Sequence, residues 1–373
     1  MRLSISCASC RQSKVKCVHK GHPPCYRCVR LSRDNRCVLT DSRSAVSPTS
    51  VRPARTLRTS PPQTRPEFPA NAPFASAATL IAACDIYRKK FPIVNFLHYP
   101  SLIADLSRDV AAVEPVFLAA LLSLCARFMT GHDLASSETY AEYARSQLAH
   151  RAFESPTLPL AQSLVMISLY EWGSGRPYRA WMYSGMATYM LQSLLKSADD
   201  QMEHPPDGSR VNTTVAYEQL VRTYWCCFAQ DCELSSGARQ HFALSFRQIS
   251  VPLPMSDSDF TFGRKATRMT PADLQRVVEN GARLSIEHGL TLVTRGFDIF
   301  VRILRFANES RRGRARGTAH STSTTWSDLK WQLDEWRALQ DVTVHFPETS
   351  ALAHVALGYG ELFAYINLVY FMG

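Results

Sequence analysis

The sequence predicts two unlike folded parts, a small metal-thiolate module at the N-terminus and a large all-α domain after it. Three observations carry this prediction. Six cysteines fall within the first 37 of 373 residues, seven prolines lie between Asp41 and Pro73, and apolar residues beyond that point recur at helical rather than alternating spacing. We therefore expect the cysteine-rich segment and the helical segment to fold, and the proline-rich segment between them to remain without a fold of its own.

The six cysteines form two similar halves. Each half is a C-x2-C pair followed by a lone cysteine, and the six residues are Cys7, Cys10, Cys17, Cys25, Cys28 and Cys37. Thiolates at such spacing are typical ligands of zinc, which takes four of them in tetrahedral geometry. Two zinc ions need eight ligand positions and six thiolates supply six, so two sulfurs must bridge both ions if no histidine joins. The pattern predicts two Zn²⁺ ions as cofactors.

Basic residues surround these cysteines. Residues 1–40 hold nine Arg and Lys against one acid, and residues 41–73 add five arginines against two acids. Everything from residue 74 onward carries 28 bases and 29 acids, so the net charge of +10 originates in the first fifth of the chain. A small module this basic attracts phosphate backbones, because each neutralised phosphate releases condensed counterions. The charge pattern therefore predicts a nucleic-acid partner.

The segment from Cys7 to Cys37 carries a specific motif. It reads Cys7-Ala-Ser-Cys10-Arg11-Gln-Ser-Lys14-Val-Lys16-Cys17, then Pro24-Cys25-Tyr-Arg27-Cys28 and finally Cys37. This motif resembles the fungal Zn2Cys6 binuclear-cluster DNA-binding domain. In that family the first and fourth cysteines bridge the metals, so the resemblance implies that Cys7 and Cys25 bridge. It also implies that Cys10 and Cys17 complete the first metal site, and that Cys28 and Cys37 complete the second.

The same resemblance implies roles for four basic residues. In the family the first helix points its C-terminal end into the major groove over a CGG triplet, and a lysine at the position of Lys14 reads those bases. Arg11, Lys16 and Arg27 match positions that mostly meet phosphates. Two positions depart from the pattern. Ser13 stands where many members have a second basic residue, and Val18 follows Cys17 where aspartate is common.

Other interpretations of the cysteines are weaker. A disulfide framework suits a secreted chain, but no secretory apolar segment precedes the cluster. His19 and His22 lie in the loop between the halves, and six thiolates already close both coordination shells. Five further cysteines follow no ligand spacing and lie in apolar helical surroundings, which indicates buried free thiols. They are Cys84, Cys125, Cys226, Cys227 and Cys232.

A proline-rich segment separates the two parts. Ser, Thr and Arg lie between its prolines, with few large apolar side chains. Such a segment cannot bury enough surface to offset its conformational entropy, so we expect it to be extended or disordered. The predicted domains are therefore a metal module at 1–40, a flexible linker rich in Pro, Ser and Arg at 41–78, and a helical domain at 79–373.

The linker also bears on assembly. Many zinc-cluster proteins hold two modules over paired half-sites with a short coiled coil, but proline excludes sustained heptads between residues 41 and 73. The nearest apolar stripe spans less than two heptads and indicates a core-facing helix instead; it consists of Leu80, Cys84, Tyr87 and Phe91. We expect any homodimer to form through the helical domain.

Helical spacing predicts ten helices after the linker. They are expected near 79–91, 101–111, 115–130, 133–153, 158–172, 178–197, 213–235, 271–307, 325–340 and 350–372. The clearest stripe lies on the helix that starts at Pro177 and consists of Tyr178, Trp181, Met182, Gly185, Met186 and Tyr189. Thr270-Pro271 is typical of another helix start. The best apolar run, from Val116 to Ala126, is too short to span a membrane, so no membrane partner is expected.

Several short motifs follow one another in this part in a characteristic order. They are Phe91-Pro92 through His98-Tyr-Pro100, Leu121 through Arg127-Phe, Ala161-Gln162 through Leu169-Tyr170, Ala180-Trp181 with Gly185-Met-Ala187, Arg222-Thr-Tyr224-Trp225 through Asp231, Ser235-Ser-Gly237-Ala-Arg239, and Val251-Pro252-Leu-Pro254. This order resembles the fungal-specific transcription factor domain, or middle homology region, well over 90–260 and loosely over 261–373. The resemblance implies an all-α regulatory domain. The chain ends at Gly373 within a predicted helix, which leaves open whether a C-terminal segment is missing or never existed.

Enzyme motifs are absent from the sequence. It contains no H-E-x-x-H, no G-x-S-x-G and no glycine-rich phosphate loop followed by lysine and a hydroxyl residue. We interpret Asp231, near Trp225 and Arg222, as part of a core ion pair rather than of an active site. The basic run from Arg311 to Arg316 is interpreted as a solvated loop, with nuclear import or a nucleic-acid contact as alternatives. We therefore expect a protein that is not an enzyme.

These observations predict a zinc-dependent, sequence-specific DNA-binding regulator of transcription that acts in the nucleus. The resemblance implies RNA polymerase II genes with CGG-type triplets as targets. It also implies double-stranded DNA and the transcription machinery or co-regulators as partners. The competing hypothesis is a cofactor-type interaction protein that acts through the helical domain without specific DNA binding. Lys14 and Lys16 favour the first hypothesis, and Ser13 leans toward the second. A metal store or zinc enzyme would need an open ligand position, which six thiolates do not leave.

Overall fold

The chain forms two units, residues 1–65 and 66–373, each of which is described by itself. The computed structural model describes residues 6–7, 9–10, 13, 15–32, 37–40, 76–131, 133–203, 213–236, 250–316 and 326–373. The predicted linker lies outside the described residues except for its last three positions. The predicted domain boundaries therefore remain predictions.

The N-terminal unit is built around sulfur rather than around a hydrocarbon core. Strand β1 (Ser6–Cys7) pairs antiparallel with β2 (Leu39–Thr40), which joins the two ends of the module. Helix α2 (Tyr26–Arg30) starts directly after Cys25. The buried residues of the described part are five of the six cysteines, with Cys17 and Leu39 packed against them. So small a unit has too little apolar surface to fold on that basis alone.

The second unit is helical, as the sequence predicted, and its described residues form no sheet. Its α-helices are α3 (Ala77–Lys90), α4 (Tyr99–Arg108), α5 (Pro115–Cys125), α6 (Leu134–Arg151), α7 (Leu158–Gly173), α8 (Pro177–Glu203), α9 (Thr213–Ser235), α10 (Asp257–Thr261), α11 (Asp273–Glu279), α12 (Gly289–Arg316), α13 (Trp326–Leu339), α14 (Ala351–Ala356) and α15 (Gly360–Met372). Short 3-10 turns are η3 (Pro92–Val94), η4 (Val110–Ala112), η5 (Ala126–Phe128), η7 (Ile286–His288) and η8 (Val342–Val344). No helix in the described residues is long and apolar enough to cross a membrane.

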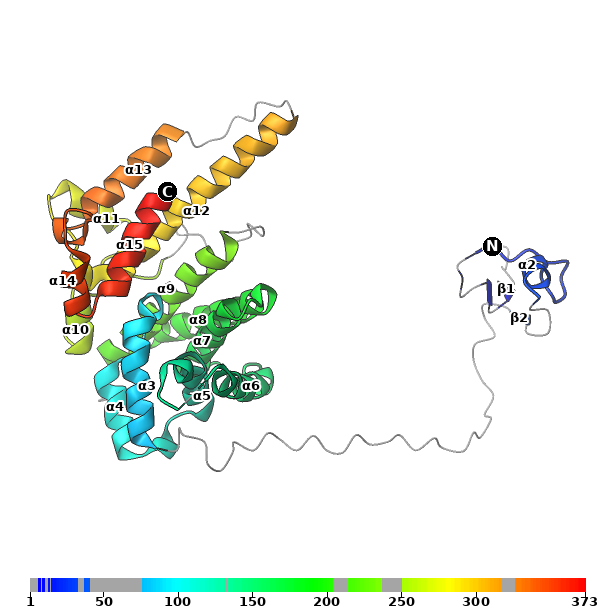
Figure 1. The fold of residues 1–373 in the computed structure, drawn as a ribbon, viewed down its shortest axis with the longest axis horizontal. Coiled ribbons are helices and arrows are strands. Elements are labelled where there is room, and N and C mark those ends of the chain that lie inside the picture. The colour runs from blue at the N-terminus through cyan, green and yellow to red at the C-terminus, as the bar shows by residue number, and fades with distance from the viewer. Residues whose placement is uncertain are drawn as a thin grey trace. The chain divides into compact units, whose positions relative to one another are not determined.

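The helices pack in two groups that share α9 (Figure 1). In the first group α5 packs against α3, α6 and α7, and α7 also packs against α8 and α9. In the second group α12 packs against α13 and α15, and α14 packs against α15. Because α9 contacts α7 and α8 on one side and α12 on the other, it joins the two groups.

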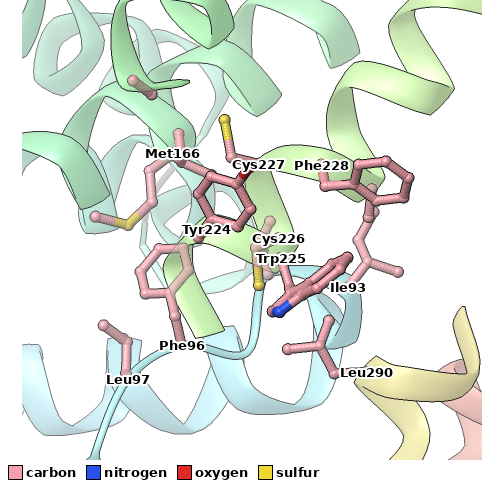
Figure 2. Packing of buried hydrophobic residues seen from close by; sticks show 14 of the residues in the cluster. Ile93, Phe96, Leu97, Met166, Tyr224, Trp225, Cys226, Cys227, Phe228 and Leu290 are labelled. Atoms are coloured by element: carbon pink, nitrogen blue, oxygen red, sulfur yellow. The ribbon is translucent and has the colours of Figure 1, made fainter. Parts of the chain in front are cut away.

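Aromatic and sulfur-containing side chains of α9 fill the space between these groups. Figure 2 shows Tyr224, Trp225 and Phe228 among residues of η3, α7 and α12. The indole Nε1–H of Trp225 donates to the Pro252 carbonyl oxygen at 2.7 Å, so the one polar group of this buried ring is satisfied. The ring of Phe228 meets that of Trp225 edge to face, with centroids 5.6 Å apart.

Two predicted helices are each broken in the structure. The helix expected at 271–307 is divided into α11 and α12, because Gly281 adopts a φ of +71° after α11 ends. The helix expected at 350–372 is divided into α14 and α15 at Gly358, whose φ is +82°. Thr270 does not cap α11 as predicted. Instead, its N–H and hydroxyl both donate to Asp273, the first residue of the helix.

The basic run from Arg311 to Arg316 was predicted to be a loop, and this prediction was wrong. Helix α12 continues through Arg316. Arginine is a good helix former, so the run extends a helix that the pattern ended at residue 307.

The predicted core ion pair exists, but with different partners. The Arg222 side chain is buried, and its Nε lies 3.1 Å from Glu218 Oε1 on the preceding turn of α9. Its NH1 lies 2.8 Å from Asp257 Oδ1 at the start of α10, and its NH2 donates to the Met255 carbonyl oxygen. The guanidinium also lies over the Phe260 ring, 4.3 Å from its centroid. Arg222 thus pairs with Glu218 and Asp257, because the segment around residue 255 folds back onto α9.

We expect Arg222→Ala to destabilise the helical unit by about 3–5 kcal/mol, since it leaves two carboxylates near the core without their cation. Burial raises the pKa of Glu218 above its ordinary value even with Arg222 present. Removing the cation raises that pKa further. A carboxyl with a raised pKa favours the fold at low pH and opposes it as pH rises through the pKa, so the stability deficit should grow from pH 5 to pH 8.

Chemical denaturation at several pH values measures this effect. Arg264→Ala is the matched control, because Arg264 is mostly exposed and lies 3.5 Å from Asp259, so its loss should cost less than about 1 kcal/mol. Equal losses for the two variants, or a deficit that shrinks as pH rises, contradict the assignment of Arg222 as the buried cation.

Candidate metal centre and nucleic-acid interface

The N-terminal cysteines lie together at distances that suit a metal ion. The Sγ atoms of Cys7, Cys10, Cys25 and Cys28 all lie within 4.8 Å of one another and could hold a metal. Cys7 Sγ is 3.8 Å from Cys25 Sγ and from Cys28 Sγ, and Cys10 Sγ is 3.7 Å from Cys25 Sγ. Four sulfurs bound about 2.3 Å from a tetrahedral zinc lie about 3.8 Å from one another. The observed separations fit that geometry and exceed the length of a disulfide bond.

Cys17 and Cys37 complete the cluster in equivalent ways. The backbone N–H of Cys7 donates to Cys17 Sγ at 3.4 Å, and the backbone N–H of Cys25 donates to Cys37 Sγ at 3.2 Å. The first cysteine of each C-x2-C pair thus orients the lone cysteine of its own half. The two halves of the module therefore repeat in their hydrogen bonds as well as in their cysteine spacing.

The first cysteine of each pair is also the one with a lowered pKa. The backbone N–H of Cys28 lowers the pKa of Cys25 to about 6. Burial opposes the same shift at Cys7, but the backbone N–H of Cys10, 3.4 Å from the sulfur, still brings its pKa below the ordinary value. Burial raises the pKa of Cys10 and raises that of Cys28 to about 12. Keeping all six cysteines deprotonated therefore requires a nearby cation, and a divalent metal ion is a suitable one.

Cys7 and Cys25 interact with thiols of both halves. The thiols of Cys10 and Cys17 both interact with those of Cys7 and Cys25. The thiols of Cys28 and Cys37 also interact with both Cys7 and Cys25. Cys10 and Cys28 lie in the same group of four sulfurs as Cys7 and Cys25, so these distances do not assign the thiols to separate ions.

The two loop histidines contact backbone groups close to them in the chain. The backbone N–H of Gly21 donates to His19 Nδ1 at 3.1 Å, and His22 Nδ1 lies 3.4 Å from the Pro23 carbonyl oxygen. In the part of the chain that the structure describes, the group able to hold a metal contains thiols only. This agrees with their interpretation as loop residues.

Two of the four predicted DNA contacts fall within the described residues. Lys16 is exposed just before Cys17, and Arg27 is half-buried on α2. Arg11 and Lys14 lie outside the described residues, so their base and phosphate contacts remain predictions. Sequence reasoning gave no role to Arg30, which is exposed in the last turn of α2 beside no acidic residue of that helix. The sequence could have indicated Arg30, because it lies three residues after Arg27 and residues at that spacing share a helix face.

The cysteines of the helical unit are buried, as predicted. Burial raises the pKa of Cys84 to about 12 and that of Cys227 to about 11. Burial also holds the pKa values of Cys125, Cys226 and Cys232 above the ordinary thiol range. Protonated thiols are poor metal ligands and poor nucleophiles. Several N-terminal cysteines also have raised pKa values, so what sets that group apart is proximity: in the described residues, the cysteines gathered closely enough to hold a metal are N-terminal ones.

A cluster of charges in the helical unit is structural rather than catalytic. Glu171 is buried on α7 and lies 2.7 Å from Arg145 NH1 and 2.5 Å from Arg176 Nε. Glu138 accepts from the Tyr170 hydroxyl and from both arginines. Burial opposes the ionisation of Glu138, but these donors lower its pKa to about 2. Such a carboxylate stays charged and paired, which ties α6, α7 and the start of α8 together.

Comparison with known proteins identifies the family. Residues 85–285 match the model of the fungal specific transcription factor domain, which covers more than half of the chain. The chain therefore belongs to this family of fungal transcription factors and is not an enzyme, as the sequence predicted. No solved structure matches the chain significantly.

Individual relatives agree with this assignment. The chain is 28% identical to the Zn(2)-C6 fungal-type transcription factor FTF1c of Fusarium oxysporum f. sp. lycopersici over 183 residues, or 46% of this chain and 19% of that protein. An uncharacterized transcriptional regulatory protein of Schizosaccharomyces pombe is 30% identical over 178 residues, or 45% of this chain and 18% of that protein. A second one from the same yeast is 27% identical over 309 residues, or 70% of this chain and 43% of that protein. The chain thus spans less than half the length of these relatives.

Proposed function

We propose that this chain binds two zinc ions through its N-terminal cysteines and uses the module they hold to bind CGG-type triplets in double-stranded DNA. Cys7 and Cys25 bridge the ions in this proposal. The observation that carries it is the close grouping of the thiols around these two residues, with Cys7 Sγ 3.8 Å from the Sγ atoms of Cys25 and Cys28 and Cys10 Sγ 3.7 Å from that of Cys25. Zinc supplies the positive charge that six clustered thiolates require, and it plays no chemical part beyond that.

The charge of the module supports DNA as the ligand. Nine basic residues within residues 1–40 offset a cluster whose net charge with two Zn²⁺ is −2, and they leave a positive surface for phosphate. Lys14 reads the triplet, and Arg11, Lys16 and Arg27 contact phosphates. The relatives' names place them among transcription regulators. We therefore infer that the chain regulates transcription of RNA polymerase II genes in the nucleus, with its helical unit contacting the transcription machinery or co-regulators.

The zinc content provides the first test. Native mass spectrometry of the full chain should show two Zn²⁺ per chain. Cys25→Ser should lose more than one ion, because it removes a bridging thiolate from both sites at once. Cys84→Ser is the matched control, since it removes a buried cysteine outside the cluster and should retain both ions. One zinc in the parent protein, or an unchanged content in Cys25→Ser, contradicts the binuclear arrangement.

Base reading provides the second test. Lys14→Ala should cost about 1–3 kcal/mol on a CGG-containing duplex and flatten the preference at that triplet, because it removes a donor to guanine. Arg27→Ala should weaken binding to all sequences alike and make the salt dependence shallower by about one unit. Fluorescence anisotropy titrations at several salt concentrations measure both. Equal losses on CGG and scrambled DNA for Lys14→Ala contradict direct reading and favour the cofactor-type alternative.

Half-site spacing provides the third test. With seven prolines before residue 74, residues 1–78 should bind one triplet with an affinity that a second triplet does not change. Any cooperativity should appear only in the full chain and should tolerate several spacings, because a flexible linker of 33 residues has a root-mean-square reach of about 30 Å. Gel-shift titrations on single and paired triplets measure this. Strong dependence of residues 1–78 on one spacing reveals a dimer element that the proposal lacks.

A further inference from the structure

Helix α8 presents a face that nothing in the described part of this chain covers. Its buried face consists of Ala180, Ser184, Ala187, Thr188 and Leu191, which pack toward α7 and α9. The large apolar residues of the stripe noted in the sequence mostly lie on the other side. Tyr178 is 59% exposed, Met182 is 45% exposed and Tyr189 is 75% exposed. Aromatic residues and methionine are enriched where protein surfaces meet.

The glycine in this exposed face has no purpose within one chain. Gly185 lies in the middle of α8, and a methyl group added to its Cα meets no atom within 4 Å. A glycine inside a helix costs about 1 kcal/mol relative to alanine. No positive φ and no close neighbour offsets that cost here. A helix of another molecule crossing at this position does offset it, because the missing side chain allows the two backbones to approach.

The exposed face forms a regular seam. The α8 seam is defined here as Tyr178, Met182, Gly185, Tyr189, Ser193, Lys196 and Asp200, all exposed or half-buried. Their spacings are four, three, four, four, three and four residues, which keeps all seven on one face of the helix. The series is symmetric about Tyr189. A helix packed antiparallel on its own copy, with Tyr189 on the two-fold axis, therefore places Gly185 opposite Ser193 and Met182 opposite Lys196.

We propose that α8 is the surface through which two copies of this chain associate, as an antiparallel pair with Tyr189 at the two-fold axis. Tyr189 stacks on its symmetry mate, and the small Gly185 and Ser193 let the helices approach on either side. The aliphatic stem of Lys196 covers Met182. Such a contact is isologous, so one seam serves both partners and the assembly closes at two copies.

Charges at the ends of α8 favour this partner and this orientation. Arg179 lies in the first turn and Asp199 and Asp200 lie near the last, which is opposite to the preference of the helix dipole. In the antiparallel pair, Arg179 of one copy lies opposite Asp199 and next to Asp200 of the other. Within its own chain Arg179 NH1 reaches only to 3.8 Å from Glu171, which Arg145 and Arg176 already neutralise. In the pair, the second copy gives Arg179 acidic neighbours in addition to the shared Glu171.

This inference names the surface for the homodimer expected through the helical unit, and so it rests on the proposed function for its biological meaning. The association itself does not depend on DNA or zinc. We expect sedimentation equilibrium of the full chain to show a reversible dimer. Tyr189→Glu and Gly185→Leu should each raise the dimer dissociation constant by at least about tenfold. Gly185→Leu should also raise the melting temperature of the monomer, because leucine is the better helix former, which separates a blocked contact from a damaged fold.

A charge exchange tests the orientation. Arg179→Glu and Asp200→Arg should each weaken the dimer, and the double variant should restore it to within about threefold of the parent, since both charges are reversed together across the axis. Leu352→Glu is the matched control, because Leu352 is a 78% exposed apolar residue on α14 and its loss should leave the dimer intact.

Other results overturn the inference. A monomeric parent chain refutes it, and so does a dimer that is broken by Leu352→Glu but not by Tyr189→Glu. Failure of the double variant to restore association refutes the antiparallel pairing. Fluorescence anisotropy with a duplex that holds a single CGG triplet distinguishes failure of the dimer inference from failure of the DNA-binding proposal. Tyr189→Glu should bind one triplet as tightly as the parent does, and a parent that dimerises without binding DNA refutes the DNA proposal alone.

Discussion

Six sulfur atoms crowded into the centre of the N-terminal unit are the constraint on which that unit depends. In the described residues of this unit the buried side chains are thiols rather than hydrocarbon groups. Backbone N–H groups favour the thiolate at Cys7 and Cys25, while burial disfavours it at Cys10 and Cys28. A cluster of this kind is able to bind a metal cation, and in so small a unit we expect metal binding and folding to be coupled.

Helix α9 has the corresponding role in the helical unit. It carries the aromatic residues that lie between the two helix groups (Figure 2). It also carries the buried Arg222, whose guanidinium ties α9 to the start of α10. The carbonyl oxygens of Pro252 and Met255 accept hydrogen bonds from Trp225 and Arg222. The helix therefore fixes the position of an irregular segment that would otherwise have unsatisfied backbone groups. The family motif around residues 222–231 and the one at 251–254 are thus halves of one packing arrangement.

Local features were predictable from the sequence and long-range partners were not. Cysteine spacing placed the sulfur cluster, and helical periodicity placed α3 to α9 to within a few residues, because both depend on neighbours along the chain. The breaks at Gly281 and Gly358 were missed, although glycine at a positive φ is a known signal for a helix end. The pairing of Arg222 with Asp257 could not be found, since 35 residues separate them, whereas its pairing with Glu218, four residues earlier on the same helix, follows helical spacing. The stripe on α8 identified a helix correctly but not its buried side, because Tyr178, Met182 and Tyr189 are exposed while small residues such as Ala180 and Ala187 are buried together with Leu191.

The distribution of charge separates the two units chemically. The first 73 residues carry all of the net positive charge, and the remaining residues carry nearly equal numbers of acids and bases. A neutral helical unit neither competes for phosphate nor is repelled by a second copy of itself, so association between copies depends on shape and on a few placed charges. Under the proposed function, the metal module determines the affinity for DNA and the helical unit determines how many modules one duplex holds, so we expect mutations to change either property without changing the other.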